Sequence, residues 1–174
     1  MKKWLFLILL FPLTCVAQTY RYIGVEDGLS NRRGYCIQKD KTGYMWFLTH
    51  EGIDRYNGKE FKRYKLMDGD AEVNSLLNLN WLYIDQEGVL WEIGKKGKVF
   101  RYDQIHDCFN LVYKLPMESF SEQPDPITYA WLDENKHIWL CNKDTIFLYN
   151  TETQLVTHIK NDISEEITDI EQID

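Results

Sequence analysis

Short apolar segments separated by polar turns follow one another from residue 34 to residue 159. Within them, apolar and polar positions alternate or form brief apolar runs, and β-branched and aromatic residues are frequent. Because successive side chains of a strand point to opposite faces, this pattern predicts β-strands. These segments lack the 3.6-residue period of an amphipathic helix. The sequence therefore predicts an all-β fold.

The predicted strands fall into three groups of four. They are 34–39, 44–49, 53–56 and 61–65; 80–84, 89–93, 99–102 and 108–113; and 128–132, 138–141, 146–149 and 155–159. The loops inside each group are short, which favours antiparallel hairpins. Four short strands in a repeat of about 45 residues are typical of a β-propeller blade. We therefore expect about three four-stranded blades of an incomplete, truncated ring.

A recurring frame marks the turn between the first two strands of each group. Its three copies are Asp40–Trp46, Asp85–Trp91 and Asp133–Trp139, and the Trp residues are 45 and 48 residues apart. An Asp side chain accepts backbone N–H groups two residues on, and the Gly of the first two copies supplies a positive φ. The third copy has Lys136 instead, and we assign the left-handed conformation there to Asn135.

The frame also predicts equivalent places in space. Trp46, Trp91 and Trp139 should lie on the second strand of successive blades. A Tyr follows each Trp by ten or eleven residues. Because these aromatic residues occupy fixed repeat positions, we interpret them as packing between blades rather than as a platform for a sugar.

The N-terminus has the pattern of a secretory signal peptide. Residues 1–3 include two Lys residues, residues 4–13 are apolar, and Ala17 precedes Gln18. The apolar run is shorter than the roughly 20 residues that span a membrane. A lipid anchor at Cys15 is the alternative that we consider less favourable.

Domain boundaries follow from the repeat. We assign residues 1–17 to the signal peptide, 18–66, 67–115 and 116–160 to propeller repeats, and 161–174 to the start of a fourth, truncated repeat. The last assignment rests on Ile167–Asp174, an apolar strand pattern that ends in Asp. Because Ile163, Ile167 and Ile170 also have helical spacing, an acidic helix is the alternative for this segment.

Charge and cysteine content restrict the partners and the chemistry. The formal net charge of -7 argues against nucleic acid or an anionic membrane surface as a partner of this segment. Removal of the leader would leave Cys36, Cys108 and Cys141, without a C-x-x-C pair. We therefore expect neither a disulfide framework nor a zinc site.

The first repeat resembles a known family. The residues that carry the resemblance are Glu26–Asn31, Asp40–Trp46, Thr49–Gly58 and Phe61–Tyr64. They resemble the two-component regulator propeller repeat, which opens the N-terminal periplasmic sensor region of hybrid two-component histidine kinases. The family usually has Trp-x-Gly-Thr, and Leu48 stands here in place of that Gly.

The resemblance implies a sensor fragment. The chain would contribute to sensing an oligosaccharide, without catalysis or a cofactor, and its parent would be a sensor histidine kinase in the inner membrane. The implied partners are the remaining blades of the parent chain, an oligosaccharide, and a second copy of the full-length sensor. Two alternatives stay open: a secreted propeller scaffold or adhesion protein, and a fragment of a propeller-type polysaccharide lyase or hydrolase.

Few residues suggest a site. Trp81 and Trp131 lie outside the repeated frame and are the better candidates for ligand contact, while 31–33 precede an innermost strand and could face a propeller mouth. The carboxylates Glu118, Glu122 and Asp125 lie in a Pro-rich connection. The histidines show no metal-ligand spacing. We therefore assign no catalytic, cofactor-binding or metal residue and leave the ligand-binding residues unassigned.

The leader generates the first testable prediction. The mature, exported protein should begin at Gln18, because small residues precede that position after the apolar run. N-terminal sequencing of periplasmic material measures this directly. An intact Met1 would contradict the prediction, and a lipid-modified Cys15 would favour the lipoprotein alternative.

Overall fold

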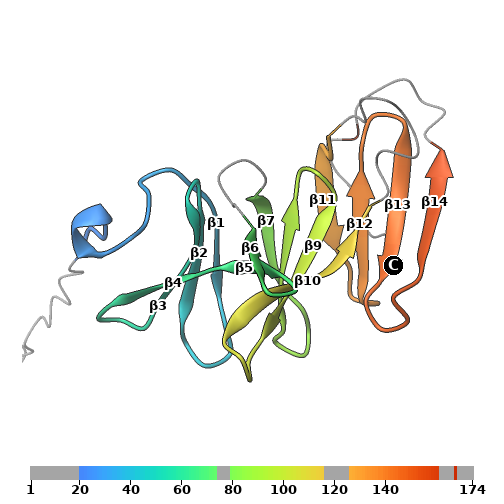
Figure 1. Ribbon diagram of the computed structural model, residues 1–174. Helices are drawn as coiled ribbons and strands as arrows, with labels where there is room; N and C mark the ends of the chain where they lie inside the picture. Colours follow the sequence, from blue (N-terminus) through green and yellow to red (C-terminus); the bar gives the residue numbers. More distant parts are fainter. Residues whose placement is uncertain (1–19, 74–78, 116–125, 161–166, 168–174) are drawn as a thin grey trace, which may run out of the picture.

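The computed structural model describes residues 20–73, 79–115, 126–160 and 167. In this part of the chain the strands form three sheets, which stand side by side along the sequence (Figure 1). The predicted all-β class is confirmed. None of the helices in these residues is long and apolar enough to cross a membrane.

The first and third sheets have the predicted four strands in sequence order, all antiparallel. The first contains β1 (Gly34–Lys39), β2 (Met45–Thr49), β3 (Gly52–Tyr56) and β4 (Phe61–Tyr64). The third contains β11 (Tyr129–Leu132), β12 (His137–Cys141), β13 (Thr145–Asn150) and β14 (Val156–Lys160). All twelve predicted strands, including those of the middle sheet, are present, and their ends differ from the prediction by at most one residue.

The middle sheet corrects the predicted four-stranded unit. Besides β7 (Leu79–Ile84), β8 (Leu90–Gly94), β9 (Lys98–Asp103) and β10 (Cys108–Lys114), it contains β5 (Leu66–Asp68) and β6 (Ala71–Val73). The hairpin β5–β6 adds to the edge of the sheet, where β5 runs parallel to β10. Each of its strands has three residues around a turn at Gly69, which has φ 60°. Such short strands leave no alternating pattern to read in the sequence.

Each repeated Asp holds its turn, and the predicted bond from the backbone N–H two residues on is present in the first two copies, from Thr42 at 2.9 Å and Glu87 at 3.0 Å. One carboxylate oxygen accepts a backbone N–H four residues on, from Tyr44 at 3.0 Å, Val89 at 2.8 Å and His137 at 2.8 Å. The other oxygen accepts the indole N–H of the Trp six residues on, at 2.7, 2.9 and 2.9 Å in chain order. The three Trp residues thus occupy equivalent places, on β2, β8 and β12, as predicted.

One detail of the third turn was predicted wrongly. Gly43 and Gly88 have the expected positive φ of 95° and 90°, but in the third copy Lys136 itself has φ 63°. Asn135 does not take this role. Two hydrogen bonds hold the backbone of Lys136. Its N–H donates to the carbonyl of Asp133, and its carbonyl accepts the N–H of Thr151. These contacts fix a conformation that a Lys side chain does not favour.

Two core layers fill the spaces between the sheets. The first core layer lies between the first and second sheets and contains Trp46, Leu48, Ile53, Tyr64, Leu66, Leu82, Leu90, Phe100 and Phe109. The second core layer lies between the second and third sheets and contains Trp91, Ile93, Val99, Leu115, Ile127, Ala130, Ile138, Leu140, Phe147 and Tyr149. In both layers, the Trp-bearing face of one sheet packs against the opposite face of the next. Trp46 and Trp91 are therefore buried packing residues, as the repeat predicted.

A short 3-10 helix, η2 (Val25–Asp27), precedes the first sheet. The segment that follows it bonds to the sheet through Ser30, whose backbone N–H and hydroxyl both donate to the buried carboxylate of Asp54, at 3.1 and 2.5 Å. The Ser30 hydroxyl also lies 2.8 Å from the hydroxyl of Thr49. These contacts hold Ser30 against the face of the first sheet that points away from the second sheet.

Some predictions lie outside the described residues. They are the signal peptide at 1–17, the Pro-rich connection with Glu118, Glu122 and Asp125, and almost all of the fourth repeat at 161–174.

The Asp turns generate a prediction on stability. Asp85→Ala should lower the free energy of unfolding by about 2–4 kcal/mol, because the buried indole N–H of Trp91 and two backbone N–H groups lose a charged acceptor. Chemical denaturation followed by Trp fluorescence measures the change. Asp144→Ala, at an exposed turn of the third sheet, is the control and should change stability by less than about 0.5 kcal/mol. Equal effects of both substitutions would contradict the role of the Asp–Trp bond.

Candidate functional site: grooves between neighbouring sheets

Two grooves open between neighbouring sheets at the end of the molecule where the Asp turns lie. The first groove, between the first and second sheets, has a volume of about 510 Å³, and its walls include Asp40, Tyr44, Arg55, Gln104 and Asp107. The second groove, between the second and third sheets, has a volume of about 300 Å³, and its walls include Asp85, Arg101, Lys136, Glu152 and Gln154. The repeat thus produces the same hollow twice.

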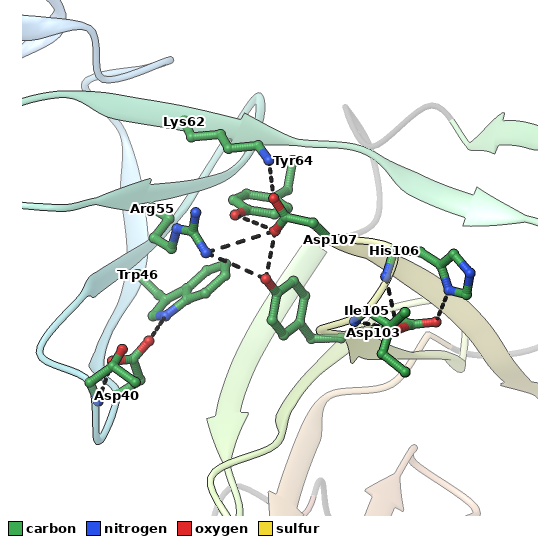
Figure 2. A network of polar contacts seen from close by, with 11 residues as sticks. Asp40, Trp46, Arg55, Lys62, Tyr64, Asp103, Ile105, His106 and Asp107 are labelled. Atoms are coloured by element: carbon green, nitrogen blue, oxygen red, sulfur yellow. Dashed lines mark hydrogen bonds and ion pairs between the residues drawn. The ribbon is translucent and has the colours of Figure 1, made fainter.

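A polar network joins the two sheets at the first groove (Figure 2). We call it the Asp107 network, and its members are Arg55, Lys62, Tyr64, Tyr102 and Asp107. Asp107, in the turn before β10, accepts hydrogen bonds from the hydroxyls of Tyr64 at 2.7 Å and Tyr102 at 2.6 Å. It also accepts from the ammonium group of Lys62, and Arg55 lies 3.7 Å away as an ion-pair partner. Three of these side chains belong to the first sheet and two to the second.

The network changes the acidity of its members. Partial burial acts to raise the pKa of Asp107, but hydrogen bonds from Lys62, Tyr102 and Tyr64 outweigh it and hold the pKa well below the ordinary value. Burial and the hydrogen bond to Asp107 raise the pKa of Tyr64. Asp107 is therefore an anion and Tyr64 a neutral donor over the whole physiological range of pH.

Arg55 lies over aromatic rings as well as beside Asp107. Its guanidinium carbon is 4.5 Å from the ring centre of Tyr44 and 5.4 Å from that of Trp46. The strand register explains the contact with Trp46, because Arg55 on β3 stands directly opposite it on β2. In the second sheet, Arg101 stands opposite Trp91 and lies 5.8 Å from its ring centre. Each groove therefore has one guanidinium group stacked on the repeat Trp.

The second groove differs in its charged residues. Gln154 occupies the turn position of Asp107, and both have a left-handed backbone, with φ of 59° and 53°. The carboxylate at the centre of the first groove thus has no counterpart here. Instead, the ammonium group of Lys136 binds Glu87 at 2.5 Å and Glu152 at 2.7 Å, which links the turns of the second and third sheets.

The candidates named from the sequence lie elsewhere. Trp81 is partly buried against the second core layer, and Trp131 is tilted against Trp139 with ring centres 6.5 Å apart; neither lines a groove. Asn31 caps the backbone N–H of Arg33 and bonds to Glu51. Arg32 is exposed beside Glu26. Residues 31–33 lie next to the β2–β3 turn, at the opposite end of the first sheet from the first groove.

Other reactive side chains have local partners. His106 bonds to Asp103 at 2.7 Å, and His137 bonds to Asp133 at 3.2 Å. Cys36, Cys108 and Cys141 are free thiols. Within the described ranges, no cluster of His, Cys, Asp or Glu is arranged to hold a metal ion.

Sequence reasoning missed Lys62, Tyr64 and Asp107 as a group. Lys62 and Asp107 are 45 residues apart, and their contact arises from the packing of two sheets that each follow their own pattern. The signal that could have been used is the Arg that directly precedes the repeat Tyr in the first two copies, at Arg55 and Arg101.

Comparison by sequence gives no match to a family model, and no curated protein matches the chain.

Solved structures do match. The extracellular domain of a hybrid two-component system from B. thetaiotaomicron is 26% identical, with a TM-score of 0.61, over 80% of this chain and 20% of that chain. A second such domain from the same bacterium is 20% identical, with a TM-score of 0.63, over 85% of this chain and 19% of that chain. Virginiamycin B lyase from Staphylococcus aureus is 18% identical, with a TM-score of 0.56, over 78% of this chain and 44% of that chain.

These matches confirm the resemblance to the sensor region of two-component systems. The match at 26% identity carries this conclusion, whereas the others, at 20% or less, show a similar fold. This chain spans about one fifth of the length of the extracellular domains that it matches.

The Asp107 network predicts a dependence of stability on pH. The folded-state pKa of Asp107 is below its unfolded value, so its contribution is present above pH of about 4 and is lost as the pH falls further. Asp107→Asn should therefore lower the free energy of unfolding at pH 7. In acid, the difference in this free energy between the variant and the wild type should become smaller. Denaturant unfolding at a series of pH values measures this. Asp144→Asn, the matched change at an exposed turn, should show neither effect, and identical profiles for both variants would contradict the prediction.

Proposed function

We propose that this chain, which matches the extracellular sensor region of hybrid two-component systems, forms part of a propeller that senses an oligosaccharide for a histidine kinase. The observation that carries the proposal is the similarity to one such extracellular domain, at 26% identity over 80% of this chain. Three sheets built on one repeated frame support it, because a sensor propeller is assembled from such units.

The packing of the sheets supports a propeller arrangement. In a propeller, every blade contacts the next in the same way, so equivalent residues must recur at each contact. Here Trp46 and Trp91 face the following sheet, and the grooves with Arg55 and Arg101 recur with them. We propose that the three sheets are three blades, and that the hairpin β5–β6 is an addition to the second.

Two observations support an extracytoplasmic location. The N-terminal 17 residues have the pattern of a secretory signal, and the matched domains are extracellular. We propose export to the periplasm, with a parent protein held in the inner membrane and a second copy as its partner in signalling. The chain itself contributes scaffold and part of the sensing surface, and catalysis belongs to the parent.

The side chains that line the first groove are better suited to binding a polar, uncharged ligand than to catalysing a reaction. Tyr44 and Tyr102 offer aromatic surface, while Arg55, Gln104 and Asp107 offer donors and acceptors. Sugars are bound by such combinations of hydrogen-bonding groups and apolar contact. Most of these polar groups also bond to one another, so we expect the groove to supply only part of an oligosaccharide site. The likeness to the lyase, at 18% identity, extends to the fold alone and does not favour an enzyme.

The proposal predicts where signalling resides. The complete gene should encode a membrane helix and a kinase domain beyond this segment, and the full-length protein in membranes should phosphorylate itself with ATP. Residues 18–174 alone should not. Sequencing of the gene and a phosphorylation assay with labelled ATP decide this, and a gene without a kinase domain would contradict the proposal.

Affinity gives a second test. The full-length sensor should bind one member of an oligosaccharide panel with micromolar affinity, whereas residues 18–174 should bind no more tightly than millimolar, worth about -4 kcal/mol. Calorimetry measures both. Micromolar binding by residues 18–174 alone would show that the complete site lies in this chain, and the absence of any binding by the full-length sensor would remove the oligosaccharide from the proposal.

A further inference from the structure

A carboxylic acid without a partner lies in the middle of the fold. Glu92 is on β8, an inner strand of the middle sheet, and its side chain is 0% exposed. Neither of its carboxyl oxygens has a hydrogen-bond partner among the described residues. A buried polar group without a partner is costly, and a buried charge without a partner more so.

The strand register shows which layer Glu92 faces. It stands between Leu82 on β7 and Phe100 on β9, and both neighbours belong to the first core layer. Side chains directly opposite one another in a sheet point to the same face. Glu92 therefore points into the packing between the first and second sheets.

The other repeats place apolar residues at this position. Like Glu92, Phe47 on β2 and Leu140 on β12 directly follow the repeat Trp of their sheet and pair with the next strand. In the first sheet, the residue opposite Phe47 is an acid, Asp54, and its side chain is nearly as buried as that of Glu92. Asp54, however, receives two hydrogen bonds from Ser30. The fold thus supplies donors for one buried acid and none, from the described residues, for the other.

The titratable groups around this layer are bound elsewhere. Tyr44 packs against the layer with its ring centre 4.5 Å from the guanidinium carbon of Arg55. The others are, from the first sheet, Cys36 on β1, Arg55 on β3, and Lys62 and Tyr64 on β4, and from the second sheet, Lys98 and Tyr102 on β9. The thiol of Cys36 donates to the Leu82 carbonyl, and Lys98 lies beside Asp68. The remaining four belong to the Asp107 network. None of these groups has a hydrogen bond to Glu92.

We propose that Glu92 makes the first core layer sensitive to protons: the first and second sheets pack closely only while this carboxyl is neutral, and its ionisation at higher pH loosens them. The inference rests on the burial of Glu92 and on its missing partners, and it does not depend on the proposed function.

The direction of the effect follows from linkage. Burial raises the pKa of Glu92 well above its ordinary value. In the unfolded chain the group ionises near the ordinary Glu pKa of about 4.3. Between these two pKa values the folded state holds one more proton than the unfolded state, so the free energy of unfolding falls as the pH rises. The unfolding equilibrium constant should increase by up to about tenfold per pH unit in this window.

Substitution at position 92 tests the proposal in the 174-residue chain. The residue at the equivalent position of the third sheet is Leu140, so Glu92→Leu restores the apolar pattern of the repeat. This variant should be more stable than the wild type at pH 7, and the difference should grow from pH 5 to pH 8. Glu92→Gln keeps the shape but cannot ionise, and its difference from Glu92→Leu should not change with pH. Burial also raises the pKa of Asp54, the other buried acid, so Asp54→Asn should remove only the contribution of Asp54 and keep the part of the fall in stability that Glu92→Leu abolishes.

A second measurement reports the proton itself. The carbon-13 shift of the Glu92 carboxyl, or the infrared carbonyl band that disappears in Glu92→Gln, should show a protonated acid at pH 7. An ionised Glu92 at pH 7 in the folded chain would overturn the proposal. A wild-type stability profile parallel to that of Glu92→Leu across this range would overturn it as well.

Discussion

The fold depends on one interaction that occurs in every sheet, the bond between an Asp carboxylate and the indole N–H of a Trp six residues later. A Trp side chain buries a large apolar area, but its single N–H must keep a partner when water is excluded. The Asp that already holds the turn supplies that partner. The same carboxylate therefore sets the turn, orients the Trp ring across the sheet and fixes what the next sheet contacts.

The contacts between sheets follow from this orientation, and their polar parts differ. At the first contact, Asp107 collects two hydroxyls and two cationic groups, whereas at the second, Lys136 joins Glu87 and Glu152. The central charged residues of both arrangements lie in turns. Turn residues differ from repeat to repeat, whereas the strands keep their apolar pattern. Two contacts with the same apolar basis thus have opposite central charges.

The sequence predicted the strands well because each carries its own alternating pattern and each turn its own Asp. The hairpin β5–β6 was not predicted, because strands of three residues are too short to show an alternation of apolar and polar positions. The φ of Lys136 was not predicted because propensity favours Asn135, while tertiary hydrogen bonds decide otherwise. The Asp107 network and the isolation of Glu92 could not be predicted, since both depend on which faces of separate sheets meet. Of the candidate site, only the recurring Arg before the repeat Tyr was visible in the sequence.

The two acids of the first contact respond to pH in opposite ways. Hydrogen bonds from Lys62 and the two tyrosines keep Asp107 ionised, so its contribution is lost only when the pH falls below the range where an unfolded Asp titrates. Burial keeps Glu92 neutral, so the unfavourable contribution of that group begins when the pH rises above the range where an unfolded Glu titrates. The layer between the first and second sheets therefore has its greatest stability in a limited interval of mildly acidic pH. At the second contact, the hydrogen bonds that Lys136 donates to Glu152 and Glu87 raise the pKa of Lys136, so its charge persists through neutral pH. At the first contact, by contrast, one acid sets the lower limit of this interval of pH and the other sets its upper limit.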